Sequence, residues 1–417
     1  MHHLIFSRGP IKLYPLPGTE EYVRKVAKWL AGNFLKDIGK DREDIAKFFF
    51  FDEEEVMELD KHLHSDEELL EFIADSITGG CNYFSHRNGA IEVSLKNSAR
   101  GKDVFIFHTF SQCKITDYNG VNLNLSLSDQ ELLLYNTLDA FMESKVDSIR
   151  IMELNLGQAR SDRPKGRGSC NLRTFFRNIT ANGADHIIMY QIHSMKSLIG
   201  IDIRQTVYDN LRGEALLKKY ILRNHVKTTV AFEEIVKKDW IFSSVDAGGK
   251  EFAASFSKSF QTPLVVVDKR RNSLTNNVEE VTILKPDYLS IEGKTVFIVD
   301  DMIDSGGSIV DVCKKYKELG AKEVNVAVVY GLFSPPAEER LSKLVKDGVL
   351  NKVIVTDLIL HSDEFFARNP YIEVADTTYT TARVIQKTNQ GRSLDKYFKP
   401  LDAIEYLATK VEPESKS

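Results

Sequence analysis

Two adjacent carboxylates and a loop of small residues stand close together near position 300. Asp300 and Asp301 directly follow an apolar run at residues 296–299. The loop comes next and comprises Asp304, Ser305, Gly306, Gly307 and Ser308. Small residues let an anion approach the backbone, successive N–H groups at a helix start favour a phosphate, and carboxylates accept hydrogen bonds from ribose hydroxyls. The pattern therefore predicts a site for a phosphorylated sugar.

The elements that must position this site are a buried strand at residues 296–299 and a helix at residues 308–319. The non-functional alternative is an ordinary strand, turn and helix, but it leaves the two neighbouring acids without a role. A related sequence, GKDVFIF at residues 101–107, mirrors GKTVFIV at residues 293–299. Each copy is followed by a predicted helix and a further strand. We therefore expect two similar α/β domains with sites at the carboxyl ends of parallel strands.

Six further stretches of the chain carry polar or charged residues beside apolar runs. They are residues 99–106 (ARGKDVFI), 157–163 (GQARSDR), 183–193 (GADHIIMYQIH), 243–249 (SSVDAGG), 265–271 (VVVDKRR) and 331–337 (GLFSPPA). Together with residues 296–312, and in this order, they resemble the ribose-phosphate diphosphokinase (phosphoribosyl-pyrophosphate synthetase) family. The resemblance runs from about residue 84 to about residue 399.

The resemblance implies two tandem phosphoribosyltransferase-like α/β domains, with parallel sheets flanked by helices. It also implies magnesium-dependent transfer of the diphosphoryl group of ATP to C1 of ribose 5-phosphate, which releases AMP. By resemblance, residues 304–308 hold the 5-phosphate, and Asp300 and Asp301 hold the ribose hydroxyls. The domains are expected at residues 81–213 for the nucleotide and 214–399 for ribose 5-phosphate.

The same resemblance assigns the residues that would handle ATP and magnesium. Binding of ATP is expected from Arg160, Asp162 and Arg163. Arginines suit this task because their guanidinium groups fork onto phosphate oxygens. Catalysis is expected from Lys269, Arg271 and His193, and the magnesium site from His193 and Asp246. Phosphoryl transfer depends on positioning and on neutralising oxygen charge, which fits such a set of cations and a metal.

The chain departs from the family pattern on its nucleotide side. Counted back from Arg100, the places of the family's adenine pocket hold His86, Asn88 and Ala90, while Phe84 lies two residues early and Glu92 two residues late. Either a local insertion restores this pocket or nucleotide recognition differs. In some members of the family, three other positions bind a regulatory phosphate or ADP. By resemblance, these positions correspond to Ser98, Arg100 and Ser334 in this chain.

Residues 1–80 lie outside the resemblance and read as a mainly helical N-terminal extension, since apolar residues recur at helical spacing. Residues 400–417 read as a tail. The formal net charge of −5 gives no reason to expect nucleic acid or an anionic membrane as partner. The four cysteines show no metal-ligand spacing and suit free thiols in a reducing cytoplasm. Family members commonly form dimer-based hexamers, so a homo-oligomer is expected.

Three hypotheses for the function follow from these observations. The first is an active synthetase, and the second is a non-catalytic relative that tunes one, which the nucleotide-side departures favour. The third is a phosphoribosyltransferase that consumes the activated sugar. The third would use the same loop but does not explain two related domains or the motifs on the ATP side.

Overall fold

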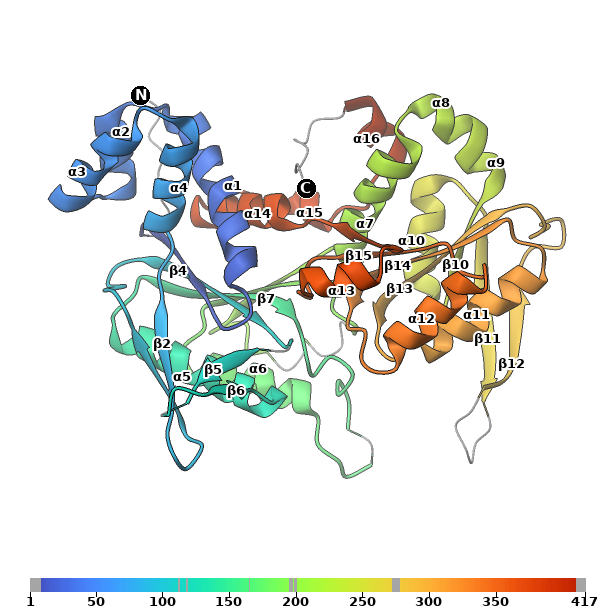
Figure 1. The fold of residues 1–417 in the computed structure, drawn as a ribbon, viewed down its shortest axis with the longest axis horizontal. Coiled ribbons are helices and arrows are strands. Elements are labelled where there is room, and N and C mark those ends of the chain that lie inside the picture. The colour runs from blue at the N-terminus through green and yellow to red at the C-terminus, as the bar shows by residue number, and fades with distance from the viewer. Residues whose placement is uncertain are drawn as a thin grey trace. The chain divides into compact units, whose positions relative to one another are not determined.

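The computed structural model describes residues 9–111, 113–117, 119–164, 166–194, 198, 201–271 and 278–409, with residues 270, 271 and 278–280 described by their backbone. The chain forms two compact units (Figure 1). The first unit lies within Met1–Leu211 and Thr378–Phe398, and the second lies within Arg212–Thr377 and Lys399–Ser417. The predicted boundary near residue 213 falls close to this division.

The first unit is built on a five-stranded parallel sheet. Its strands, in spatial order, are β1 (Ile11–Pro15), β4 (Asp103–Thr109), β7 (Ser148–Asn155), β8 (His186–Tyr190) and β9 (Val207–Leu211). Its longer helices are α1 (Glu20–Ile38), α5 (Leu127–Glu143), α6 (Asn171–Ala181) and α14 (Thr378–Asn389). Figure 1 shows α1 and α14 above the sheet and α5 and α6 below it. Strands covered on both faces need apolar residues on both faces, which explains why β4, β7 and β8 are buried throughout.

The N-terminal segment contains the predicted helices, and its mainly helical character is confirmed. Helices α2 (Arg42–Phe49), α3 (Glu53–His62) and α4 (Asp66–Ser76) follow α1. Strand β1 is absent from the prediction. It has only five residues and lies next to prolines, so it shows little alternation of apolar and polar residues, and a long helical pattern follows it. Its pairing with β4 makes residues 11–15 part of the sheet. Two short hairpins complete the unit: β2 (Cys81–Ser85) with β3 (Ile91–Leu95), and β5 (Lys114–Thr116) with β6 (Asn122–Asn124).

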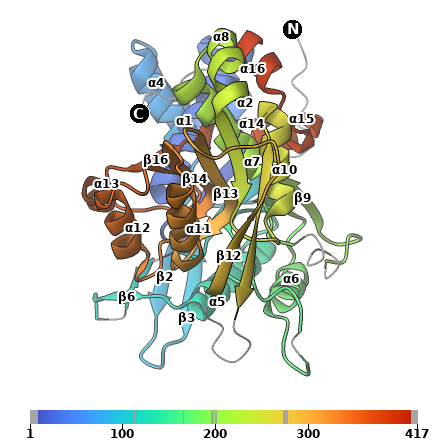
Figure 2. The ribbon, with the colours of Figure 1, turned by 90° about the vertical axis from the view of Figure 1, so that its right-hand side faces the viewer.

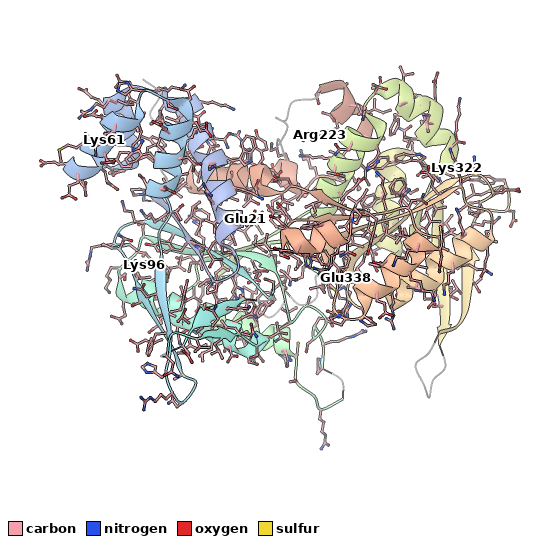
Figure 3. The ribbon with its side chains drawn as sticks, viewed as in Figure 1. Glu21, Lys61, Lys96, Arg223, Lys322 and Glu338 are labelled. Carbon is pink, nitrogen blue, oxygen red and sulfur yellow. The ribbon has the colours of Figure 1, made fainter. Side chains whose placement is uncertain are left out.

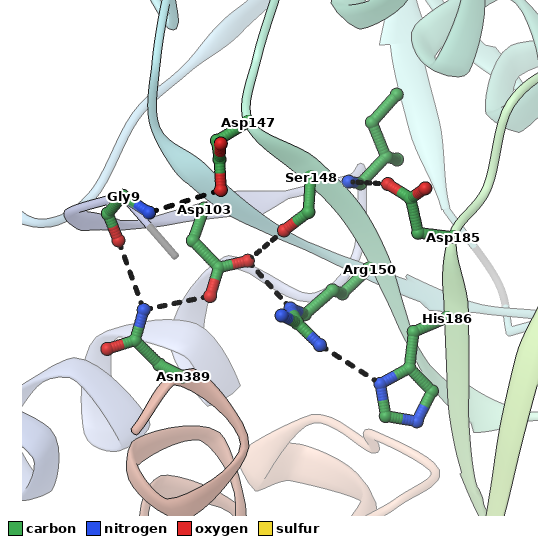
Figure 4. Close-up of polar contacts among 9 residues, drawn as sticks. Gly9, Asp103, Asp147, Ser148, Arg150, Asp185, His186 and Asn389 are labelled. Atoms are coloured by element: carbon green, nitrogen blue, oxygen red, sulfur yellow. Dashed lines mark hydrogen bonds and ion pairs between the residues drawn. The ribbon is translucent and has the colours of Figure 1, made fainter. Parts of the chain in front are cut away.

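A buried polar cluster joins α14 to the amino ends of β4 and β7 (Figure 4). The carboxylate of Asp103 accepts hydrogen bonds from Arg150 Nε at 2.6 Å and Asn389 Nδ2 at 2.8 Å. Ser148 Oγ also donates to this carboxylate. Near the other end of α14, in its first turn, the hydroxyl of Thr381 lies 2.7 Å from Tyr22 Oη. These contacts explain why Thr378–Phe398 packs with the first unit, whereas the predicted second domain, residues 214–399, includes these residues.

The second unit contains a seven-stranded sheet that is parallel except at one edge. Its strands, in spatial order, are β12 (Val278–Leu284), β11 (Leu264–Arg271), β10 (Trp240–Ser244), β13 (Thr295–Ile303), β14 (Glu323–Gly331), β15 (Lys352–Thr356) and β16 (Ile372–Ala375). Only β12 runs antiparallel to its neighbour. The core consists largely of Val and Ile from these strands, packed under the flanking helices.

Helices cover both faces of this second sheet (Figure 2). One face carries α11 (Gly307–Glu318) and α12 (Ala337–Lys346), and the other carries α7 (Gly213–Ile221) and α10 (Lys250–Phe260). Shorter helices of this unit are α8 (Thr229–Ala231), α9 (Lys237–Asp239), α13 (Asp363–Arg368) and α16 (Ala403–Thr409), and two π-helical turns span Leu222–Val226 and Phe232–Val236. Helix α15 (Asp395–Phe398) belongs to the first unit. The predicted fold class of two α/β domains with helix-flanked parallel sheets is confirmed.

Long charged side chains, such as those of Lys61, Lys96 and Lys322, extend from the exposed parts of both units (Figure 3). Among the helices that the structure describes, none combines the length and the apolar character needed to cross a bilayer. All four cysteines, which are Cys81, Cys113, Cys170 and Cys313, are buried free thiols.

Candidate active site

The acidic pair and the small-residue loop lie at the carboxyl end of β13. Pairing with β14 continues as far as Ile303, so Asp300 and Asp301 belong to the strand rather than following it. Helix α11 begins at Gly307, one residue before the predicted start, and Gly306 caps it with a φ of 74°. Glycine suits this position because a positive φ is costly for residues with a side chain.

The backbone donors at this helix start are available to a ligand. The N–H groups of Ile309 and Val310 both donate to the carbonyl of Gly306. No described residue accepts a hydrogen bond from the N–H groups of residues 305–308. Four unsatisfied donors at the amino end of a 12-residue helix form an anion-binding concavity, because the helix dipole adds positive charge there.

A third carboxylate, Asp246, joins the acidic pair through the parallel pairing of β10 with β13. Ser244 pairs with Val299, so the loop after β10 lies beside Asp300. The Oδ1 atom of Asp246 accepts hydrogen bonds from the N–H groups of Gly248 at 2.9 Å and Gly249 at 3.2 Å. A Cβ atom on Gly249 would lie only 3.5 Å from Asp300 Oδ1. The loop after β10 and the carboxyl end of β13 therefore meet closely at this edge of the sheet.

The environment of Asp300 strongly favours its protonated form. Burial, followed by the negative charges of Asp301 and Asp246, raises the pKa of the Asp300 carboxyl from 3.8 to about 8. Such a concentration of acids is costly to the fold, and hydrogen-bond donors or a cation from a ligand would relieve it. The cluster is therefore better explained by binding than by stability.

The predicted catalytic lysine reaches the same loop from β11. Lys269 Nζ donates a hydrogen bond to the carbonyl of Ser308 at 2.8 Å. Arg271 is the last residue of β11, and its side chain lies outside the described part. Ser334 lies after β14, where its carbonyl accepts from Ala337 N at 3.0 Å. Within the second unit, the structure thus brings together Asp246, Lys269, Asp300, Asp301 and the loop.

The predicted ATP-binding residues lie at the carboxyl edge of the first unit's sheet. Arg160, Asp162 and Arg163 belong to the loop between β7 and α6, and His193 follows the neighbouring parallel strand β8. This loop is held at Ser161, whose Oγ accepts from Asn171 N at 3.1 Å. A second contact joins the loop to α5, where Gln158 Nε2 donates a hydrogen bond to Glu131 Oε1 at 2.8 Å. Ser98 and Arg100 belong to a turn before β4, where Arg100 N donates to Ser98 Oγ at 3.4 Å.

A buried pair beneath this edge is missing from the prediction. His108 on β4 and Glu153 on β7 form a contact of 2.7 Å between Nδ1 and Oε2, with both side chains almost fully buried. Burial raises the pKa of Glu153 above its usual value. The ring of Phe110 packs edge-on against His108 and fills the space beside Gly157, at the start of the loop that contains Arg160. A carboxylate within the otherwise apolar residues 151–154 is the signal that the sequence offers.

The residues that match the family's adenine pocket by position lie in the turn of the β2–β3 hairpin. Ser85 pairs with Ile91, and residues 86–90 form the turn. His86, Asn88 and Ala90 line an open surface hollow together with Phe84 and Arg87. His86 Nε2 also contacts Glu92 Oε2 at 2.9 Å. The three positions therefore share one hollow at the turn of this hairpin.

Three comparisons identify the class of protein. A family model described as "Phosphoribosyl transferase domain" matches residues 221–362. Chloroplastic ribose-phosphate pyrophosphokinase 2 of Oryza sativa subsp. japonica is 33% identical over 275 residues, which is 66% of this chain and 60% of that one. Ribose-phosphate pyrophosphokinase of Campylobacter jejuni is 31% identical over 312 residues, which is 75% of this chain and 88% of that one.

The fold agrees with this class. The solved structure of phosphoribosylpyrophosphate synthetase from Mycobacterium smegmatis superimposes with a TM-score of 0.66 at 20% identity, covering 92% of this chain and 99% of that one. This chain therefore belongs to the ribose-phosphate pyrophosphokinase family. The family and the enzyme class predicted from the motifs are confirmed.

Proposed function

We propose that this chain transfers the diphosphoryl group of ATP to C1 of ribose 5-phosphate, giving phosphoribosyl pyrophosphate and AMP. The observation that carries the proposal is the set of unsatisfied N–H groups at residues 305–308, next to Asp300 and Asp301. The N–H groups suit the 5-phosphate, and the two acids suit the ribose hydroxyls. This arrangement would hold the acceptor sugar with C1 exposed for reaction.

The remaining roles concern ATP and the charge that develops during transfer. Arg160, Asp162 and Arg163 bind ATP, and His193 contacts its phosphates. Lys269 and Arg271 stabilise the transition state, because ammonium and guanidinium groups placed near the transferred phosphate offset its negative charge. The hydrogen bond of Lys269 to the Ser308 carbonyl supports this role, since it keeps the ammonium group beside residues 304–308, the sugar-phosphate loop.

Magnesium is the cofactor that the proposal requires. The described residues contain no group of three His, Cys, Asp or Glu side chains that could enclose a metal. Magnesium commonly uses one or two carboxylates and completes its shell with water and substrate phosphates. Asp246 would supply a carboxylate to the ion. Burial, followed by the negative charges of Asp301 and Asp246, raises the pKa of the neighbouring Asp300, and a cation would offset this negative charge. When bound, magnesium neutralises the phosphate oxygens of ATP.

Several finer assignments belong to the same proposal. The first unit serves ATP and the second serves ribose 5-phosphate, with residues 1–80 as an addition for packing or assembly. The hollow at His86, Asn88 and Ala90 receives the nucleotide base. Ser98 and Arg100 in the first unit, and Ser334 in the second, are residue types that suit binding of a regulatory anion. The protein is a cytoplasmic homo-oligomer built from dimers, and the four free thiols support a reducing compartment.

The experiment is to incubate the purified protein with magnesium, ATP and ribose 5-phosphate and to quantify AMP. We expect AMP to form only when the sugar phosphate is present, in equal amount to phosphoribosyl pyrophosphate. A chain that binds both substrates but forms no AMP would favour the non-catalytic relative. Release of diphosphate from phosphoribosyl pyrophosphate on adding a nucleobase would instead indicate a phosphoribosyltransferase.

A further inference from the structure

A guanidinium from a neighbouring helix supports the sugar-phosphate loop. Arg340 lies on α12, and its Nη1 donates a hydrogen bond to the carbonyl of Ser305 at 2.9 Å. Ala337 lies one turn earlier on the same helix, and its Cα is 3.7 Å from where a Cβ on Gly306 would be. Helix α12 therefore contacts the loop at two successive residues, 305 and 306.

The second glycine of the loop admits this guanidinium. A Cβ atom on Gly307 would lie 3.3 Å from Arg340 Nη1, which is tighter than an ordinary contact. Because residue 307 is glycine, the guanidinium can approach the first turn of α11. The positive charge thus lies close to the first turn of α11, which begins at Gly307.

Arg340 forms no ion pair with a carboxylate in the described part of the chain. The nearby Arg368 shows the usual alternative, since its Nε bonds Glu338 Oε1 at 3.0 Å, and Glu338 lies on the same helix as Arg340. A guanidinium that bonds a loop carbonyl next to unsatisfied N–H groups retains its full charge for an anion.

We propose that Arg340 is a further positioning residue for the 5-phosphate of the sugar. In a trans peptide the C=O and the following N–H point in opposite directions. By holding the Ser305 carbonyl outward, Arg340 directs the N–H of Gly306 into the concavity, and its charge adds to the attraction for the phosphate. This inference rests on the proposed function, because it takes ribose 5-phosphate as the ligand of the loop.

The test is to measure binding of ribose 5-phosphate by calorimetry, together with steady-state kinetics, for Arg340→Ala and Arg340→Lys. The matched control is Arg368→Ala, which removes a guanidinium from the neighbouring helix α13. We expect Arg340→Ala to raise the Kd and KM for ribose 5-phosphate roughly tenfold, as for loss of a charge-assisted hydrogen bond. The KM for ATP should change less than twofold. Arg340→Lys should recover part of the affinity because it keeps the charge.

Two results would overturn the inference. One is an unchanged Kd for ribose 5-phosphate in Arg340→Ala, and the other is an equal loss in Arg368→Ala, which would indicate a general effect on the fold. Failure of the unaltered protein to bind ribose 5-phosphate would instead remove the proposed function. The two failures are therefore distinguishable in one series of titrations.

Discussion

Replacing Asp300 by asparagine should make the ligand-free protein more stable and less active. The pKa of this carboxyl rises from 3.8 to about 8 on folding, chiefly through burial and then through Asp301 and Asp246. At pH 7 the unfolded carboxyl is about three pH units above its pKa. For a group fully shielded from solvent, this difference would lower the free energy of unfolding by about 4 kcal/mol. Asp300 keeps some exposure to solvent, which screens its charge, so we expect a gain of about 1–2 kcal/mol.

The sign of the pH dependence follows from the direction of the shift. Below about pH 4 the carboxyl is protonated in both the folded and the unfolded chain, so it carries no penalty. As the pH rises from 4 to 8, only the unfolded chain loses the proton, and folding becomes less favourable. Asparagine has no proton to lose, so the advantage of Asp300→Asn should grow across this range and level off above about pH 8.

The assay is urea unfolding of both proteins at several pH values between 5 and 8.5, without magnesium or substrates. The control is Asp287→Asn, which changes an exposed aspartate after β12 and should alter the free energy of unfolding by less than 0.5 kcal/mol. In the activity assay we expect Asp300→Asn to lose at least tenfold in kcat/KM for ribose 5-phosphate. A stability difference that does not vary with pH, or a less stable variant, would refute the reasoning.

Three other substitutions test separate parts of the account. Lys269→Ala should lower kcat by about 10²–10³ and leave the Kd for ribose 5-phosphate unchanged, and normal turnover would remove its catalytic role. Gly306→Ala should lower the free energy of unfolding by about 1–2 kcal/mol, because a φ of 74° is strained for alanine, and it should weaken binding of ribose 5-phosphate. The matched control, Ala337→Gly, should leave the loop intact. Asp103→Ala should lower the free energy of unfolding in urea by about 3–5 kcal/mol, because Arg150 would remain buried without its carboxylate partner (Figure 4). A loss below 1 kcal/mol would contradict this expectation.

The second unit could largely be predicted from the sequence, because its signals are local. The apolar run before Asp300 predicts a buried strand, and the small residues before the following amphipathic stretch predict a loop and a helix start. The prediction ends the strand too early, since continued pairing with β14, not local composition, carries β13 to Ile303. It also starts α11 one residue late, because the first helical residue is glycine, whose low helix propensity does not predict a helix.

The features that the sequence does not reveal depend on contacts between distant residues. Strand β1 is defined by pairing with β4, about 90 positions away. The return of α14 to the first unit depends on buried hydrogen bonds of Asn389 with Asp103. The contact of Arg340 with Ser305 joins residues 35 positions apart. On a helix rich in charged residues, Arg340 looks like any solvated arginine, so only packing reveals its place.

The central claim is that a diphosphoryl group moves intact from ATP to ribose 5-phosphate. The most direct measurement uses ATP labelled in its β-phosphate, incubated with magnesium, ribose 5-phosphate and the purified protein, with the products separated by chromatography. The account predicts that the label appears in phosphoribosyl pyrophosphate and that AMP is unlabelled. Label retained in ADP would show transfer of a single phosphoryl group and would contradict the account.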